Sequence, residues 1–425
     1  MPSRSLTEGR RVNELLRTWV RRLIPGLLAA ALALVAWGNL AFVARAPTQS
    51  PFVPRWIGLN AWLRQGGSPY DASVSLEAQS GMYGRPANLR RGEDPQHFLY
   101  PPAVALVLGP FALLPLSTAR AIWMTLLHVG LLTVILVAGP AFRWTMTGAI
   151  RMGVSILTLL SLPSVLAVLQ GDVAIVVVAV IMISMAALHR RHDSMAGLLA
   201  ASTIVKPQLA LLYILYLYVW GIRNQRWNLL GWLTTGLALV LGVTTALLPS
   251  WPLEVARQSL DYAGLDIFRS VVSRILGPGD EPYSAWVLIA SALVLGYLFW
   301  EWRVSLAGGE RSMLWAMMVT LALTVGLTPF ATLANQVMLI PPLLFAAGVL
   351  HDRIGQGRSV QLAFLLSAVG LLSWLASAEG LDPGGPSSAA LVVPPLVVLL
   401  ILWWVRWWAT RPSLVLEAAS LRSRE

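Results

Sequence analysis

The segment IPGLLAAALALVAWGNLAFVA (residues 24–44) decides the class of the fold, because it is an apolar run without a single charged residue. A helix of about 20 apolar residues is long enough to cross the hydrocarbon core of a bilayer. The chain then stays polar through residues 46–98, whose end carries the mixed-charge, aromatic string YGRPANLRRGEDPQHFLYPP (residues 83–102). Loops held on a rigid scaffold often carry chemistry. We therefore expect the functional site at this first outer loop.

The composition is that of a polytopic membrane protein. Hydrophobic residues make up 56% of the chain, charged residues only 12%, and the mean hydropathy is +0.67, whereas soluble chains carry about 25% charge. We predict a cytoplasmic N-terminal segment (1–23), one membrane domain (24–410) and a cytoplasmic tail (411–425). The arginine-rich start lacks a small-residue cleavage site, so the first helix is expected to be retained. The absence of cysteine excludes disulfides, thiolate metal sites and a cysteine nucleophile.

Apolar runs recur along the whole chain and predict an all-α integral membrane protein of about 12 helices. Two of these runs, at 194–205 and 207–221, are too short to cross a bilayer of about 30 Å alone. They meet at Lys206 and Pro207 and are predicted to form a helical hairpin inside the protein. The twelve predicted spans lie at 24–44, 117–138, 152–169, 172–188, 194–205, 207–221, 227–248, 284–301, 312–327, 331–349, 360–377 and 387–405.

The basic residues predict the topology, because cytoplasmic loops carry an excess of Lys and Arg. With both termini cytoplasmic, the inside segments hold 20 of the 31 basic residues and 8 of the 20 acids. The outside then has two large segments, 46–98 and 249–283, and in the first we expect an interfacial stretch at 52–63, a turn at 66–71 and a short helix at 72–83. Since the arginines flank apolar spans, the net charge of +11 indicates lipid contacts in a multi-pass plasma-membrane protein and not nucleic-acid binding.

The sequence lacks the common motifs for binding nucleotides, dinucleotides and zinc. The chain has no phosphate-binding P-loop, no dinucleotide-binding glycine pattern and no HExxH zinc motif. Its five histidines are scattered, so we expect neither a metal site nor a cofactor.

Four strings occur in a characteristic order: PFVPRWIGLNAWLRQGGSPYD (51–71), HFLYPPAVALVLGPFALLPLSTARAIW (97–123), LQGDVAIVVVAVIMISMAALHRRHDSMAGLLAASTIVKPQLALL (169–212) and LTPFATLANQVMLIPPLLF (327–345). Together they resemble glycosyltransferase family 87, enzymes of the GT-C class that use polyprenol-phosphate sugars and include α-mannosyltransferases. The resemblance covers most of residues 24–350. It implies a GT-C-like bundle and the transfer of a hexose, mannose-like, from polyprenyl phosphate to a glycan or lipid acceptor on the outer face.

The resemblance also implies a catalytic base among the acids of the first outer loop, but Pro51 stands where the family usually has aspartate. A carboxylate is needed to deprotonate the acceptor hydroxyl. The candidates are Asp71, Glu93 and Asp94. Asp71 would alternatively cap a helix N-terminus, and Glu93 and Asp94 would alternatively form ion pairs with the preceding arginines.

Two basic residues are candidates for binding the lipid phosphate. Lys206 is the only lysine and is surrounded by apolar sequence, which favours a functional role over a snorkelling one. Arg120 begins the second span and would otherwise anchor it at the interface.

Three further residues are candidates for other substrate contacts. Trp56 and Tyr100 would stack on a sugar or an isoprenoid, although ordinary packing explains them equally well. Gln170 opens the fourth span beside Asp172, which we interpret as a helix cap.

Two other functional classes compete with the transferase. If the presence of Pro51 in place of the aspartate removes the catalytic base, the protein is a relative of these enzymes that binds lipid or glycan without catalysis. A transporter is disfavoured, since few charges lie inside the spans and no six-plus-six repeat is evident. In each case the expected partners are the bilayer and, for the transferase, a polyprenyl-phosphate sugar and a glycan or lipid acceptor.

Overall fold

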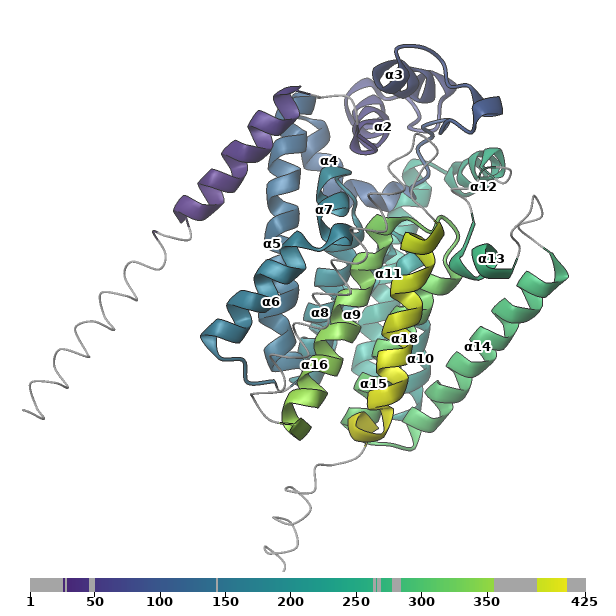
Figure 1. The fold of residues 1–425 in the computed structure, drawn as a ribbon. Helices are drawn as coiled ribbons and strands as arrows, with labels where there is room; N and C mark the ends of the chain where they lie inside the picture. The colour runs from purple at the N-terminus through teal and green to yellow at the C-terminus, as the bar shows by residue number, and fades with distance from the viewer. Residues whose placement is uncertain are drawn as a thin grey trace, which may run out of the picture.

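A computed structural model describes residues 26, 29–45, 50–142, 144–262, 265, 269–276, 284–354 and 388–410. All regular structure in these residues is helical, with seventeen α-helices, four short 3-10 helices and no strand, which confirms the all-α class. Most of the long helices run between the two ends of one bundle (Figure 1). In chain order the bundle comprises Ala29–Arg45, α5 (Leu116–Phe142), α6 (Gly148–Leu160), α7 (Leu162–Leu169), α8 (Ala174–His189), α9 (Asp193–Ser202), η3 (Thr203–Val205), α10 (Pro207–Arg223), α11 (Trp227–Leu247), α14 (Ala285–Leu306), α15 (Glu310–Leu327), η5 (Leu333–Leu339), α16 (Ile340–Ile354) and α18 (Ser388–Thr410).

Eleven of the twelve predicted spans coincide with these helices, and the twelfth, 360–377, lies outside the described residues. The count of twelve membrane crossings is nevertheless not confirmed. Within the described residues, five helices are long and apolar enough to cross a membrane, or six if the bent pair α6–α7 is one span. The difference is one of length, since α8 has 16 residues and α9 has 10, which gives about 24 Å and 15 Å at 1.5 Å per residue.

The first outer loop folds into helices at one end of the bundle, which we call the loop end (Figure 1). Helix α2 ends at Gly66 and α3 ends at Gly84, both in the left-handed conformation that glycine adopts without strain. The predicted short helix at 72–83 is α3, and the first half of α2, predicted to be interfacial, is buried in protein. The elements at this end are α2 (Phe52–Gln65), α3 (Ala72–Tyr83), η1 (Leu89–Arg91), η2 (Pro102–Val104), α4 (Ala105–Ala112), α12 (Trp251–Asp261) and α13 (Val271–Leu276).

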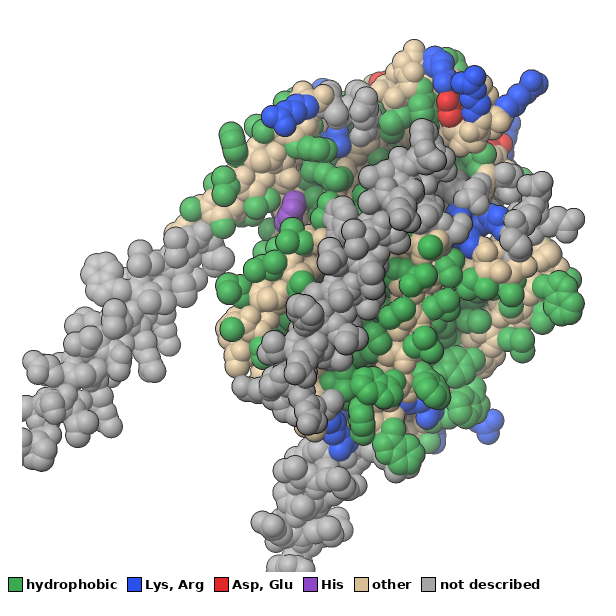
Figure 2. Space-filling model, in the orientation of Figure 1, with side chains coloured by type: hydrophobic (Ala, Val, Ile, Leu, Met, Phe, Trp, Pro, Cys, Tyr) green, Lys and Arg blue, Asp and Glu red, His purple; other side chains and the backbone are tan. Residues whose placement is uncertain are grey.

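The opposite end of the bundle, which we call the arginine end, has short connections at 190–192, 224–226 and 307–309. Figure 2 shows hydrophobic side chains over the helices between these two ends, with charged side chains gathered mainly at the ends themselves. An apolar belt between two charged rims is the arrangement that a bilayer requires. The chain is therefore a multi-pass membrane protein, and the loop end and the arginine end face opposite sides of the membrane.

Small residues allow α9 and α11 to pack very closely. A Cβ atom on Gly197 of α9 would lie 2.6 Å from the carbonyl oxygen of Leu229, and one on Gly236 of α11 would lie 2.7 Å from the Cβ of Ala201. Such close backbone approach through glycine and alanine is a common source of packing energy between membrane helices. It holds the first arm of the predicted hairpin against α11.

We predict that Gly197→Ala destabilises the protein by about 1–3 kcal/mol, because the added methyl group meets backbone atoms that cannot move aside. Gly231→Ala on α11 is the matched control, since a Cβ there would meet nothing within 4 Å. Thermal unfolding in detergent compares the two variants. Equal unfolding temperatures for both variants would contradict the close packing of α9 on α11.

We predict that the loop end faces the outside and the arginine end the cytoplasm. Arg91 and Arg223 are exposed at the two ends, and the cysteine-free chain allows single cysteines at either position. In intact cells an impermeant thiol reagent should label Arg91→Cys, whereas Arg223→Cys should react only after the cells are opened. The reverse pattern would refute this topology.

Candidate functional site

The centre of the candidate site is Lys206, which is buried at the loop end with 3% of its surface exposed. It lies at the break between η3 and α10, with φ −135° and ψ 78°. The break follows from the sequence, because Pro207 disfavours a helical conformation in the residue before it. The Lys206 ammonium donates hydrogen bonds to Asp172 Oδ1 at 2.6 Å and to Asn335 Oδ1 at 2.7 Å.

Asp172 is held at the turn between α7 and α8. Gly171 takes φ +60° at this turn, and a Cβ there would lie 3.0 Å from Phe52. Asp172 Oδ1 also accepts the Ala174 N–H at 2.7 Å, so the predicted capping of α8 is present. The same carboxylate carries the ion pair with Lys206, which the capping interpretation had not included.

Arg55 on α2 is the third charged residue at this point, together with Lys206 and Asp172. Its Nη2 lies 3.5 Å from Asp172 Oδ2, and its Nη1 donates to the carbonyl of Gly171 at 2.9 Å. The guanidinium also lies over the ring of Tyr100 at 4.9 Å. We call Arg55, Asp172, Lys206 and Asn335 the buried ion cluster. The cluster contains two cations and one carboxylate.

A chain of contacts links the buried ion cluster to the first outer loop. The Asn335 amide donates to the carbonyl of Phe330 at 2.9 Å. Phe330 has φ +59°, which is uncommon for an aromatic residue, and its ring contacts that of Tyr262 at 5.4 Å between centroids. The Tyr262 hydroxyl in turn donates to Asp94 Oδ1 at 2.7 Å. Asp94 is thus connected to Lys206 through three residues, with the backbone carbonyl of Phe330 as one of the links.

The position of Asp94 is tightly defined. Its Oδ1 accepts the Gln96 N–H at 2.7 Å in addition to the Tyr262 hydroxyl, and the residue is half-buried. Burial, together with the nearby Asp94 carboxylate, raises the pKa of Tyr262. The phenol therefore stays protonated and acts as a donor. The His97 N–H donates to the same hydroxyl at 3.2 Å.

Glu93 is occupied by a local ion pair, but its partner is Arg85 and not Arg90 or Arg91, the preceding arginines that the alternative interpretation named. Both of its oxygens accept hydrogen bonds from Arg85, at 2.7 and 2.8 Å, and Oε2 also accepts the Asn88 N–H at 2.7 Å. These bonds, chiefly the one from Arg85, lower the pKa of Glu93 to about 2. A carboxylate with so low a pKa is a weak base.

Asp71 is exposed and lies directly before α3, yet its side chain makes no capping hydrogen bond to that helix. Its Oδ2 accepts the Ser68 N–H at 3.2 Å instead. The adjacent Tyr70 donates from its hydroxyl to the carbonyl of Tyr100 at 2.6 Å. Because the Tyr100 ring lies over the Arg55 guanidinium, this bond places Asp71 next to the segment that covers Arg55.

The other predicted residues lie around the cluster without joining it. Arg120 is 2% exposed, donates to the carbonyl of Leu169 at 3.3 Å and lies over the ring of Phe42. The Trp56 indole N–H donates to the carbonyls of Phe111 and Leu114, at 3.2 and 3.1 Å, and fixes α2 to α4. Gln170 contributes its carbonyl, which accepts a hydrogen bond of 3.4 Å from Arg55.

Arg55, Asn335 and Arg269 were not predicted from the sequence. Arg55 is the polar residue of the string PFVPRW, and Asn335 and Gln336 are the polar residues of LANQVM; this contrast with apolar neighbours was the available clue. Arg269 is half-buried beside the same turn as Phe330, and its carbonyl accepts the Ala331 N–H at 3.3 Å. Among the described residues, no group of three or more His, Cys, Asp or Glu side chains is placed to hold a metal ion.

Comparison with known proteins gives one family. No curated protein and no solved structure matches the chain. The sequence model of glycosyltransferase family 87 matches residues 98–331, a region that includes Asp172, Lys206, Tyr262 and Phe330. Since this match covers more than half of the sequence, the chain belongs to glycosyltransferase family 87.

Proposed function

We propose that this membrane glycosyltransferase transfers a hexose, mannose-like, from polyprenyl phosphate to a glycan or lipid acceptor at the loop end. This end would face the outside of the cytoplasmic membrane, with both termini inside. The observation that carries the proposal is the buried ion cluster beneath the first outer loop, with two cations for one carboxylate. A phosphate has the charge that would balance the remaining cation.

The donor phosphate would bind to Arg55 and Lys206. Guanidinium and ammonium groups both recognise phosphate, and hydrogen bonds between ionised groups are about twice as strong as neutral ones. The two residues are 7% and 3% exposed. Binding would therefore require the segment around Tyr100 to move from the Arg55 guanidinium. The same cations would stabilise the charge on polyprenyl phosphate as it leaves.

Asp94 is the carboxylate that best fits the role of general base. Oδ1 accepts the two hydrogen bonds that orient the side chain, which leaves Oδ2 to accept the proton of the acceptor hydroxyl. The acceptor oxygen would then attack the anomeric carbon of the sugar while the bond from this carbon to the phosphate oxygen breaks. Polyprenyl phosphate leaves with that electron pair. Asp71 is the second candidate, and Glu93 is the least suited because Arg85 lowers its pKa.

A second candidate function is lipid or glycan binding without catalysis. The feature that favours it is Pro51, the N-cap residue of α2, which stands where the family resemblance places the catalytic aspartate. This relative would keep the donor site and lack transfer activity. The donor-binding and transfer assays described next distinguish this non-catalytic function from the enzymatic one.

We predict that Lys206→Met and Arg55→Gln each weaken the binding of a polyprenyl phosphate by about 10- to 100-fold, the worth of a hydrogen bond between charged groups. Arg85→Gln removes a cation from an exposed pair at the same end and serves as the control. Affinity is measured by titration in detergent, beside the unfolding temperature of each variant. Arg55→Lys keeps the charge and should bind with intermediate affinity. If folded Lys206→Met and Arg55→Gln bind as tightly as the control, the donor phosphate lies elsewhere.

We predict that Asp94→Asn lowers the rate of transfer by about 10²–10⁴-fold, the usual contribution of a general base. Asp71→Asn and Glu93→Gln should stay within about tenfold of wild type, and donor affinity should be unchanged in all three variants. Rates are compared under single-turnover conditions with a polyprenyl-phosphate hexose. A full rate in Asp94→Asn would exclude this base. A wild-type protein that binds the donor and transfers nothing would favour the non-catalytic relative.

A further inference from the structure

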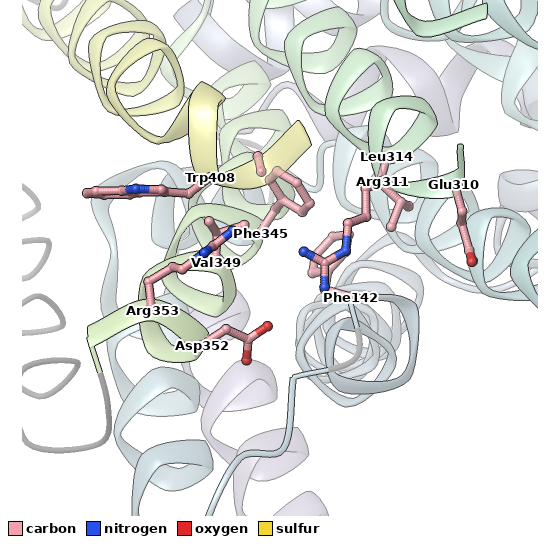
Figure 3. Close-up of a pocket in the computed structure, with 10 residues that line it drawn as sticks. Phe142, Glu310, Arg311, Leu314, Phe345, Val349, Asp352, Arg353 and Trp408 are labelled. Carbon is pink, nitrogen blue, oxygen red and sulfur yellow. The ribbon is translucent and has the colours of Figure 1, made fainter. Parts of the chain in front are cut away.

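Titratable side chains that the transfer step does not use lie at both ends of the bundle. At the arginine end, Figure 3 shows a cavity whose charged lining residues are Glu310, Arg311, Asp352 and Arg353. Two acids balance two arginines there, so the cavity favours neither an anionic nor a cationic ligand. At the loop end, a polar group joins the first outer loop to the second outer segment (249–283) and directly contacts Asp94, the proposed base.

The His97 ring ties the two outer segments together. Its Nδ1 lies 2.8 Å from the Ser75 hydroxyl of α3, and its Nε2 lies 3.0 Å from Asp261 Oδ2 of α12. A carboxylate only accepts hydrogen bonds, so Nε2 carries a proton and donates it to Asp261. Both ring nitrogens are therefore occupied, and the ring is fixed between α3 and α12, which lie at the same end of the bundle (Figure 1).

Tyr262, which follows α12, is held on several sides. It is buried, and its ring lies against those of His97 and Phe330, at 5.8 and 5.4 Å between centroids. Its hydroxyl accepts the His97 N–H at 3.2 Å and donates to Asp94 Oδ1 at 2.7 Å. Since burial raises the pKa of Tyr262, the phenol keeps its proton. With a donor on one side of the hydroxyl, this proton points to the carboxylate on the other side.

The turn that carries Asp94 and His97 has an unusual backbone. Gln96 is buried and takes φ +55°, a left-handed conformation that is uncommon for residues other than glycine. Its N–H donates to Asp94 Oδ1 at 2.7 Å, and the next N–H along the chain, that of His97, donates to the Tyr262 hydroxyl. Two successive N–H groups thus define the position of one carboxylate oxygen. Strained backbone of this kind persists where the surrounding contacts over-determine it.

We propose that Tyr262, held in place by His97, is a positioning residue for Asp94. Its hydroxyl fixes the carboxylate through Oδ1, which leaves Oδ2 for the acceptor hydroxyl. The hydrogen bond that it donates also favours the ionised carboxylate, the form that can accept a proton. This inference rests on the proposed function, in which Asp94 is the general base. It gives the second outer segment a part in the reaction, because the first outer loop does not hold the base alone.

The first test measures the ionisation of Asp94 without relying on transfer. A hydrophobic carbodiimide labels carboxyl groups in their protonated form, so labelling of Asp94 in the full-length protein in detergent falls as the pH rises, and peptide mass spectrometry gives the midpoint. Tyr262→Phe keeps the ring and removes the hydroxyl. The midpoint should rise by about one pH unit, because the carboxylate loses a hydrogen-bond donor.

Tyr83→Phe is the matched control, since it removes a hydrogen bond of 3.2 Å to the backbone carbonyl of Asp94 and not to its carboxylate. Its midpoint should equal that of wild type. The unfolding temperature of each variant is measured in parallel. A folded Tyr262→Phe protein with the midpoint of wild type would overturn the proposal.

A second variant shows whether His97 acts through Tyr262. His97→Ala should raise the midpoint of Asp94 labelling in the same direction as Tyr262→Phe. The protein with both substitutions should have the midpoint of Tyr262→Phe alone, because coupled residues do not give additive effects. Additive shifts would refute the action of His97 through Tyr262.

A transfer assay separates this inference from the proposed function. Under single-turnover conditions Tyr262→Phe should transfer the hexose about tenfold more slowly, the worth of one hydrogen bond to a charged group, with donor affinity unchanged. A raised midpoint with a full transfer rate would overturn the catalytic part of the inference, because the base would then lie elsewhere. If wild type transfers nothing, the proposed function fails, and the labelling midpoints still support or overturn the positioning of Asp94 by Tyr262.

Discussion

The ion pair between Lys206 and Asp172 is the interaction on which the loop end of the structure depends. Charges buried away from water are costly, and removing one partner of such a pair typically destabilises a protein by roughly 3–5 kcal/mol. Here the pair joins the α7–α8 turn to the break before α10, Asn335 adds η5, and Arg55 adds α2. Four segments that are distant in the sequence are thereby held at one point. The same point is where the first outer loop meets the bundle.

The surplus cation in this cluster connects the architecture to the chemistry of the family. A glycosyltransferase that takes its sugar from a lipid phosphate needs positive charge at the membrane end where the loop acids lie. The contacts from Asn335 through Phe330 and Tyr262 to Asp94 link the positively charged cluster to a loop acid. Phe330, in the middle of this path, has a strained backbone with a positive φ. Strained residues often occur where a site must be held ready or must move. The proposed displacement of Tyr100 from Arg55 would open this region to the donor.

The sequence predicted those features that depend on local chemistry. The helix break at Lys206 followed from Pro207, and helix α3 followed from its flanking turns. The partners of Lys206 were not predicted, since they come from segments 34 and 129 residues away. Arg55 was overlooked for the same reason, as its role depends on a turn 116 residues later. The count of twelve spans was not confirmed within the described residues, where five or six helices are long enough to cross a membrane, because apolar composition does not reveal the length of each helix.

The most direct measurement of the central claim is a cryo-electron microscopy structure of the protein with a polyprenyl phosphate bound. The account predicts a phosphate at the loop end, with its oxygens about 2.7–3.2 Å from Arg55 or Lys206 and Tyr100 displaced from the Arg55 guanidinium. A phosphate bound away from these residues, with the buried ion cluster unchanged, would contradict it.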